Sequence, residues 1–92
     1  MTTPLKTRVV IADDHAIVRS GLNALFGPAP DFEVVAEAED GREAVLRVME
    51  TDADLAVLDI SMPRMTGLNA AREILQRRAQ TRVLMLSMHD SE

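Results

Sequence analysis

The chain has no cysteine, tryptophan or tyrosine, and its only aromatic side chains are Phe26 and Phe32. The absence of cysteine excludes disulfides and thiolate zinc sites. Two aromatic residues are too few for a platform that stacks the bases of single-stranded nucleic acid. No apolar run approaches the ~20 residues of a membrane helix, and the N-terminus lacks the apolar segment of a secretory signal. We therefore expect a cytoplasmic protein with no membrane partner.

Positive charge is also scarce, because ten basic residues face fifteen acidic ones and the formal net charge is −5. An acidic chain of this kind is not expected to bind nucleic acid itself. Its 92 residues are enough for one domain and too few for two, since domains cluster at roughly 100–150 residues. A composition of 47% hydrophobic and 27% charged residues favours a packed core. We expect residues 1–92 to form a single domain.

Short apolar runs alternate with segments of helical spacing along the whole chain. The apolar runs predict four strands, at residues 8–12, 32–36, 55–58 and 83–86. Apolar residues spaced three and four apart predict three intervening helices, around residues 18–26, 44–49 and 68–75. The order βαβαβαβ implies right-handed crossovers and a parallel sheet covered on both faces. The expected fold class is therefore α/β, with a doubly wound parallel sheet.

Polar residues at the predicted helix starts agree with this order. Asp13 or Asp14 could cap the first helix, and Thr66 the third. Asp40 and Glu43 have the spacing of a capping box for the second helix.

Carboxylates and a hydroxyl follow the predicted strands where a parallel sheet places its ligand site. Asp13 and Asp14 follow the first strand, Asp59 follows the third and Ser87 the fourth. Carboxylates this close repel one another unless a cation or a proton intervenes, and oxygen ligands favour Mg²⁺ or Mn²⁺. Asp59 precedes a loop and cannot cap a helix, so it is the candidate to accept a phosphoryl group as an aspartyl phosphate.

Simpler interpretations apply to several charged residues near this edge. The Asp13–Asp14 pair alone could be a helix cap. His15 could contact the site, but we expect it to be exposed on the first helical turn. Arg64 is expected to be a solvated loop charge rather than a contact for phosphate. Glu37 and Glu39 are likewise expected to be solvated.

Four stretches carry a resemblance to a known family. They are IADDHAIVRSGL (11–22), DFEVVAEAEDGREA (31–44), DISMPRMTG (59–67) and RVLMLSMHD (82–90). The chain resembles the receiver domain of two-component response regulators, in particular the NarL/FixJ-like subgroup whose output domains are of LuxR type. The resemblance implies a flavodoxin-like sheet with strand order 2-1-3-4 in this chain.

The resemblance also implies roles for the carboxylates. Asp59 would be the phosphoacceptor, receiving its phosphoryl group from a histidine kinase. Asp14 would bind Mg²⁺ directly, Asp13 would bind it partly through water, and Asp59 and the backbone carbonyl of Ser61 would be further ligands. The chain would accept a phosphoryl group on itself rather than act as an enzyme, within a protein that controls transcription.

The resemblance also implies roles for three residues after the fourth strand. Ser87 would be the switch hydroxyl that bonds the phosphoryl oxygen. Met88 and His89 would line the entrance of the site.

The chain departs from the family pattern beyond the fourth strand. Family members continue with a helix, a fifth strand that ends in a lysine, another helix and then a DNA-binding output domain. This chain ends at Glu92, and its one lysine is Lys6, ahead of the first strand. We therefore expect a receiver that is incomplete at its C-terminus, with residues 83–86 at the edge of the sheet. An edge of this kind predicts a dimer that pairs through the fourth strand and its flanking faces.

Two alternatives remain open from the sequence. The chain could be a non-phosphorylated interaction or dimerisation fragment that lost its chemistry with the missing lysine. A Mg²⁺-dependent phosphohydrolase is less well supported, because the triplet from Asp59 to Ser61 lacks the second aspartate of such enzymes.

Overall fold

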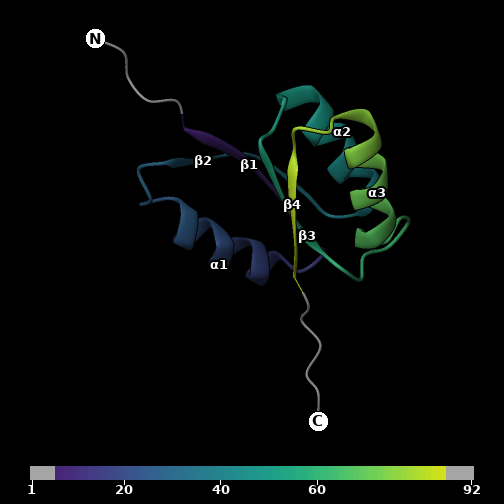
Figure 1. The fold of residues 1–92 in the computed structure, drawn as a ribbon. Helices are drawn as coiled ribbons and strands as arrows, with labels where there is room; N and C mark the ends of the chain where they lie inside the picture. Colours follow the sequence, from purple (N-terminus) through teal and green to yellow (C-terminus); the bar gives the residue numbers. More distant parts are fainter. Residues whose placement is uncertain (1–5, 87–92) are drawn as a thin grey trace.

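The computed structural model describes residues 6–86. Four parallel strands lie in the order β2-β1-β3-β4, and a helix follows each of the first three strands along the chain (Figure 1). The elements are β1 (Thr7–Ala12), α1 (Ala16–Phe26), β2 (Phe32–Ala38), α2 (Gly41–Thr51), β3 (Leu55–Asp59), α3 (Gly67–Arg77) and β4 (Arg82–Leu86). This arrangement confirms the predicted α/β class, the element order and the strand order.

The helices cover the two faces of the sheet unequally. α2 and α3 lie together on one face, and α1 lies alone on the other (Figure 1). The larger core cluster lies between the sheet and the α2–α3 pair, and includes Val10, Leu58, Val48 and Ile74. The smaller cluster, centred on Val9, Ile11 and Val57, packs against Leu22 and Phe26 of α1. No residue of α1 is itself buried, so α1 is the least embedded of the three helices.

Two of the predicted helix caps are confirmed. The Asp40 side chain accepts a hydrogen bond from the Glu43 amide at 2.8 Å, and the Thr66 hydroxyl accepts one from the Asn69 amide at 3.2 Å. The prediction for the first helix was wrong, because His15 occupies the N-cap position of α1 and makes no side-chain cap. Asp13 and Asp14 lie before this position, in the turn that leaves β1, and so they do not cap the helix.

The central strands are the most deeply buried part of the sheet. The last four residues of β1 and of β3 are buried, whereas β4 is only partly covered. β4 pairs with β3 on one side and is the last strand of the described sheet. Within residues 6–86, no helix is long and apolar enough to cross a membrane.

Candidate functional site at the carboxyl ends of β1 and β3

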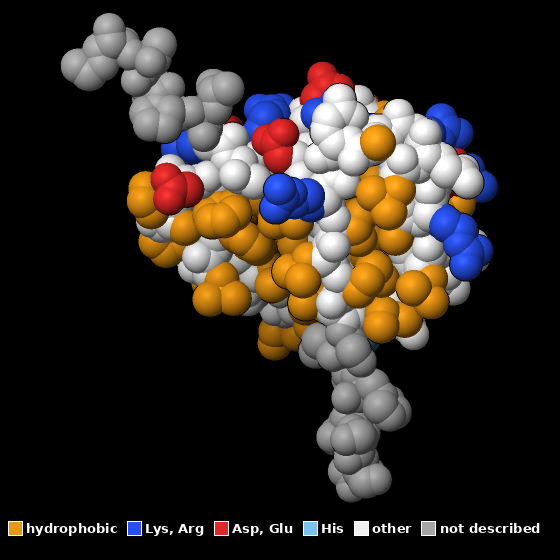
Figure 2. All heavy atoms as spheres, in the orientation of Figure 1, with side chains coloured by type: hydrophobic (Ala, Val, Ile, Leu, Met, Phe, Trp, Pro, Cys, Tyr) orange, Lys and Arg blue, Asp and Glu red, His pale blue; other side chains and the backbone are white. Residues whose placement is uncertain are grey.

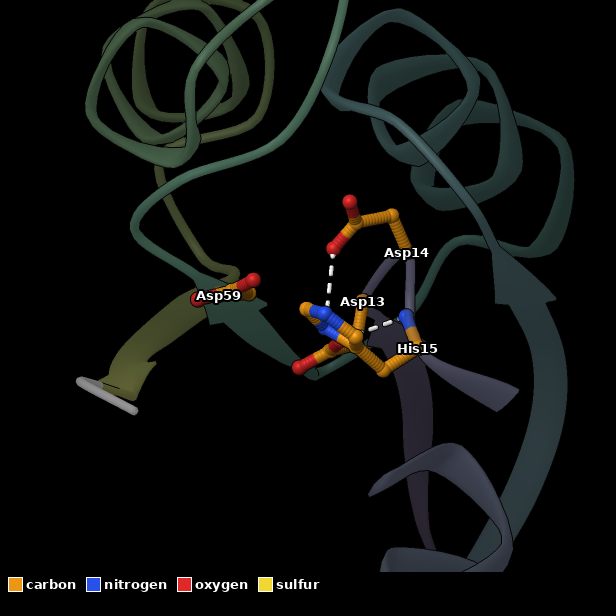
Figure 3. A group of neighbouring side chains, drawn as sticks. All are labelled: Asp13, Asp14, His15 and Asp59. Atoms are coloured by element: carbon orange, nitrogen blue, oxygen red, sulfur yellow. Dashed lines mark hydrogen bonds and ion pairs between the residues drawn. The ribbon is translucent and has the colours of Figure 1, made fainter. Parts of the chain in front are cut away.

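Three carboxylates that are far apart in sequence meet at one edge of the sheet. Asp59 is the last residue of β3, and Asp13 and Asp14 directly follow the adjacent strand β1. One ligand atom from each of these residues, and one from His15, lie within 4.8 Å of one another. Figure 3 shows the four side chains converging at the ends of the two strands. The parallel pairing of β1 with β3 is what brings them together, because both strands end at this edge.

The two innermost carboxylates are almost fully shielded from solvent. Asp13 is 0% exposed and Asp59 is 4% exposed. Burial raises the pKa of Asp59 above its ordinary value, and the negative charge of Asp13 raises this pKa further. The Ser61 amide, which donates to Asp59 Oδ1 at 3.4 Å, only partly opposes these effects. The ionised form of Asp59 is therefore electrostatically unfavourable in this site unless a positive charge lies close to it.

His15 can supply some of this positive charge when its ring is protonated. Its Nδ1 lies 3.0 Å from Asp13 Oδ1 and 3.1 Å from Asp14 Oδ1, so the ring stands between the two side chains (Figure 3). The hydrogen bond to Asp13, followed by the charge of Asp14, raises the pKa of His15. His15 is exposed, as expected, and its ring also contacts the site, which the sequence had given as the alternative. The turn after β1 directs the exposed ring back over the carboxylates, which the spacing of residues could not reveal.

The donor set fits a hard divalent cation. Asp13 Oδ1 accepts from the His15 amide at 2.8 Å, while Asp13 Oδ2 is buried and has no hydrogen-bond partner among the described residues. Buried polar atoms are normally paired, so a lone carboxylate oxygen beside two further carboxylates is well suited to a metal ion. Three carboxylates supply oxygen ligands of the kind that Mg²⁺ or Mn²⁺ prefers, and the one nitrogen donor of the group, His15 Nδ1, already contacts Asp13 and Asp14.

The loop from β3 to α3 closes tightly against the site. The Gly67 amide donates to the Ile60 carbonyl at 2.8 Å, and a Cβ at Gly67 would clash with the Asp59 carbonyl oxygen. Ser61 lies exposed in this loop, two residues beyond Asp59. The last residue of the loop therefore lies beside the end of β3, and the Ser61 backbone stays near the carboxylates.

Arg64 does not point into the cluster of carboxylates. Its Nη1 donates to Asp40 Oδ2 at 3.0 Å, and 71% of its side chain is exposed. Arg64 is thus exposed, as expected, and it also forms an ion pair with Asp40 that connects the loop to the start of α2. Asp40 serves both the helix cap and this pair, a connection that the spacing of residues did not indicate.

The predicted roles of Ser87, Met88 and His89 fall outside the described residues, which end at Leu86. Ser87 directly follows β4, the strand beside β3.

Residues 9–92 match the family described as the response regulator receiver domain. The chain belongs to this family. The resemblance inferred from the sequence motifs is thereby confirmed.

This receiver domain is similar to several regulatory proteins. It is 42% identical over 87 residues to the transcriptional regulatory protein DegU of Brevibacillus brevis, covering 95% of this chain and 37% of DegU. It is 44% identical over 86 residues to the oxygen regulatory protein NreC of Staphylococcus haemolyticus, covering 92% of this chain and 40% of NreC. The receiver domain therefore spans about two fifths of the length of these relatives.

Solved structures share the fold. The signal receiver domain of NarL from Mycobacterium tuberculosis is 38% identical with a TM-score of 0.89, covering 96% of this chain and 71% of that one. The response regulator domain of Thermotoga maritima CheB is 37% identical with a TM-score of 0.83, covering 95% of this chain and 64% of that one. A CheX–CheY–BeF3–Mg²⁺ complex from Borrelia burgdorferi gives 30% identity and a TM-score of 0.84, covering 96% of this chain and 66% of that one.

Proposed function

We propose that this receiver domain accepts a phosphoryl group on Asp59 in a Mg²⁺-dependent reaction, as the phosphoacceptor of a two-component system. The observation that carries the proposal is the meeting of Asp13, Asp14 and Asp59, with a buried Asp13 oxygen that lacks a partner among residues 6–86. The similar Borrelia complex contains Mg²⁺ and BeF3, which lends the proposal further support.

Asp59 is suited to act as the nucleophile. A carboxylate oxygen of Asp59 would form a bond to phosphorus while the bond from phosphorus to the donor's leaving atom breaks. Asp13, Asp14 and the Ser61 carbonyl would hold Mg²⁺, with Asp59 as a further ligand. When bound, Mg²⁺ neutralises charge on the transferring group. Because burial and Asp13 raise the pKa of Asp59, the same cation would also favour the ionised carboxylate that attacks.

A histidine kinase is the proposed donor, and control of transcription is the proposed role of the protein in which this receiver domain acts. The name of DegU supports the second point, because it describes a transcriptional regulatory protein. A cytoplasmic location belongs to the same proposal. Ser87 as switch hydroxyl, and Met88 and His89 as lining residues, remain part of it.

The direct test is the intact mass of the chain after incubation with acetyl phosphate and MgCl₂. We expect one phosphoryl adduct that disappears in Asp59→Asn and when EDTA replaces MgCl₂. Glu33→Gln is a matched control, because Glu33 is an exposed carboxylate on β2, and it should form the adduct normally. No adduct on folded wild-type protein would favour the alternative of a non-phosphorylated interaction module. An adduct that survives Asp59→Asn would place the acceptor elsewhere.

A second copy of the chain is the proposed partner of the β4 edge. Leu84 in this strand is 49% exposed, and Ile17 and Leu25 of α1 are exposed as well. Hydrophobic side chains gather on the side of the molecule that carries α1 and β4 (Figure 2). Within residues 6–86, β4 pairs on one side only, and an apolar strand with an unpaired edge can pair with a second β4.

Light scattering at micromolar concentration tests this partner. We expect a dimer for the wild type and a shift toward monomer for Leu84→Lys. Leu46→Lys is the control, because Leu46 of α2 is similarly exposed, at 54%, and α2 lies on the face of the sheet opposite α1. A wild-type monomer would overturn the dimer proposal without affecting phosphoryl acceptance.

A further inference from the structure

Arg19 of α1 is unusually well covered for an arginine on an otherwise exposed helix. Only 15% of its side chain is accessible to solvent, although no residue of α1 is fully buried. The guanidinium Nη1 donates to the backbone carbonyl of Asp13 at 2.6 Å. Its Nε donates to Glu37 Oε1 at 3.1 Å, and Nη2 lies 3.9 Å from Glu39 Oε2. Arg19 therefore connects α1 both to the turn after β1 and to β2.

Glu37 is held in place from its other side. Asn23, one turn further along α1, donates through Nδ2 to Glu37 Oε2 at 2.8 Å and to the Arg19 carbonyl at 3.0 Å. Both carboxylate oxygens of Glu37 are therefore engaged. Glu37 is 44% exposed, in agreement with the predicted solvated position, and it also orients the guanidinium through its hydrogen bonds. A planar guanidinium with several fixed donors suits such a bridging position better than an ammonium group.

The amide, the carbonyl and the side chain of Asp13 all form hydrogen bonds. The Asp13 amide donates to the Ala38 carbonyl of β2 at 3.0 Å, and the Asp13 carbonyl accepts from Arg19. Its side chain accepts from the His15 amide. The backbone of Asp13 is thus held on both sides, and its Oδ2 is left among the carboxylates without a partner in the described part of the chain.

We propose that Arg19, supported by Glu37 and Asn23, is a positioning residue that holds the turn after β1 so that Asp13 and Asp14 face Asp59 in the geometry that binds a divalent cation. This inference rests on the proposed function, because the cation is the Mg²⁺ of phosphoryl transfer. Arg19 touches neither the cation nor the phosphoryl group in this role. Residues that orient metal ligands typically change metal affinity by about 10–100-fold when they are replaced.

The test measures Mg²⁺ affinity separately from stability. Wild type, Arg19→Gln, Arg19→Lys and Glu37→Gln are titrated with MgCl₂ by isothermal calorimetry, under conditions where circular dichroism shows each protein to be folded. We expect Arg19→Gln to weaken Mg²⁺ binding about 10-fold, with Arg19→Lys and Glu37→Gln weakened less. Arg47→Gln is the matched control, because Arg47 also pairs with two glutamates but lies on α2, and its Mg²⁺ affinity should stay within about twofold of wild type.

A second measurement follows the turn in metal-free protein. The ¹⁵N and ¹H shifts of the His15 amide, which donates to Asp13, should move in Arg19→Gln and not in Arg47→Gln. Arg19→Gln with wild-type affinity would overturn the inference, even if its stability falls, because a purely structural role predicts that combination. If Arg19→Gln does not fold, Glu37→Gln with wild-type affinity and an unmoved His15 amide would overturn it.

The two proposals fail in different ways. A wild-type chain that binds no Mg²⁺ would overturn the proposed function. The His15 amide shifts in metal-free protein would still decide whether Arg19 orients Asp13. Mg²⁺ binding in wild type that is equally strong in Arg19→Gln would overturn the positioning role alone.

Discussion

Asp59 shows how a single residue can be unfavourable for stability and still be suited to function. It is buried beside Asp13 and near Asp14, and its burial and the charge of Asp13 both raise its pKa. Ionising such a group in the metal-free protein opposes folding, since the unfolded chain solvates the same charge freely. Strain of this electrostatic kind is typical of functional sites, where a ligand rather than the fold balances the charge.

Replacing Asp59 by asparagine should therefore stabilise the metal-free protein. In EDTA at neutral pH we expect the free energy of unfolding to rise by roughly 1 kcal/mol in Asp59→Asn, measured by urea unfolding. Because the folded protein raises this pKa, it binds the proton more tightly than the unfolded chain does. The contribution of Asp59 to stability is then greatest at low pH and is lost as pH rises through the folded pKa.

The advantage of Asp59→Asn should accordingly shrink as the pH is lowered. Glu33→Gln, at an exposed position on β2, should not reproduce this behaviour. An asparagine variant that is less stable than wild type at neutral pH would contradict the electrostatic account.

Some helices and loops around the site are held in place where two backbone segments approach each other so closely that a side chain would not fit between them. The Gly41 amide at the start of α2 donates to the Met65 carbonyl at 3.1 Å, and a Cβ on Gly41 would clash with the Met65 backbone and side chain. The Arg64–Asp40 pair joins the same two segments. α2 therefore supports the loop that leads away from Asp59.

Substitution of Gly41 by alanine should loosen this contact. We expect Gly41→Ala to lower the free energy of unfolding by about 1–3 kcal/mol, because backbone atoms must move to admit the methyl group. Gly21→Ala is the contrasting variant, since Gly21 lies within α1 and a Cβ there has nothing within 4 Å. It should raise stability by roughly 0.5–1 kcal/mol through helix propensity. Thermal melts that rank the two variants in the opposite order would contradict this account.

At the scale of the whole molecule, the candidate metal site connects two adjacent strands at the centre of the sheet. Its proposed ligands lie at the ends of β1 and β3. These two strands are buried, and their residues belong to both core clusters. A cation held there would bind the folded chain only, because the unfolded chain keeps Asp13 and Asp59 far apart. Binding and folding are then linked by mass action.

Addition of Mg²⁺ should therefore stabilise the entire domain. At a concentration about 100 times its Kd, we expect about 2.7 kcal/mol of added stability, seen as a rise in Tm that EDTA reverses. Asp13→Asn should abolish most of this rise, whereas Glu33→Gln should retain it. A Tm that does not respond to MgCl₂ would contradict a metal site in this fold.

Much of the fold could be predicted from the sequence because it depends on local patterns. Apolar runs located all four strands, although β2 extends to Ala38 and β3 includes Asp59 itself. The caps at Asp40 and Thr66 were also local, since each side chain bonds an amide three residues away. The carboxylates at the ends of β1 and β3 could be placed at one edge because parallel strands end on the same side.

Contacts that depend on the path of the backbone in space were decided only by the tertiary structure. His15 turns back over Asp13 and Asp14, Arg64 pairs with Asp40, and Arg19 joins the Asp13 carbonyl to Glu37. Each of these depends on the path of a turn or on the packing angle of a helix against the sheet. The sequence by itself determined which residues are acidic, apolar or able to cap. The tertiary structure decided which of them meet, because the direction of a side chain is set by the backbone around it rather than by its position in the chain.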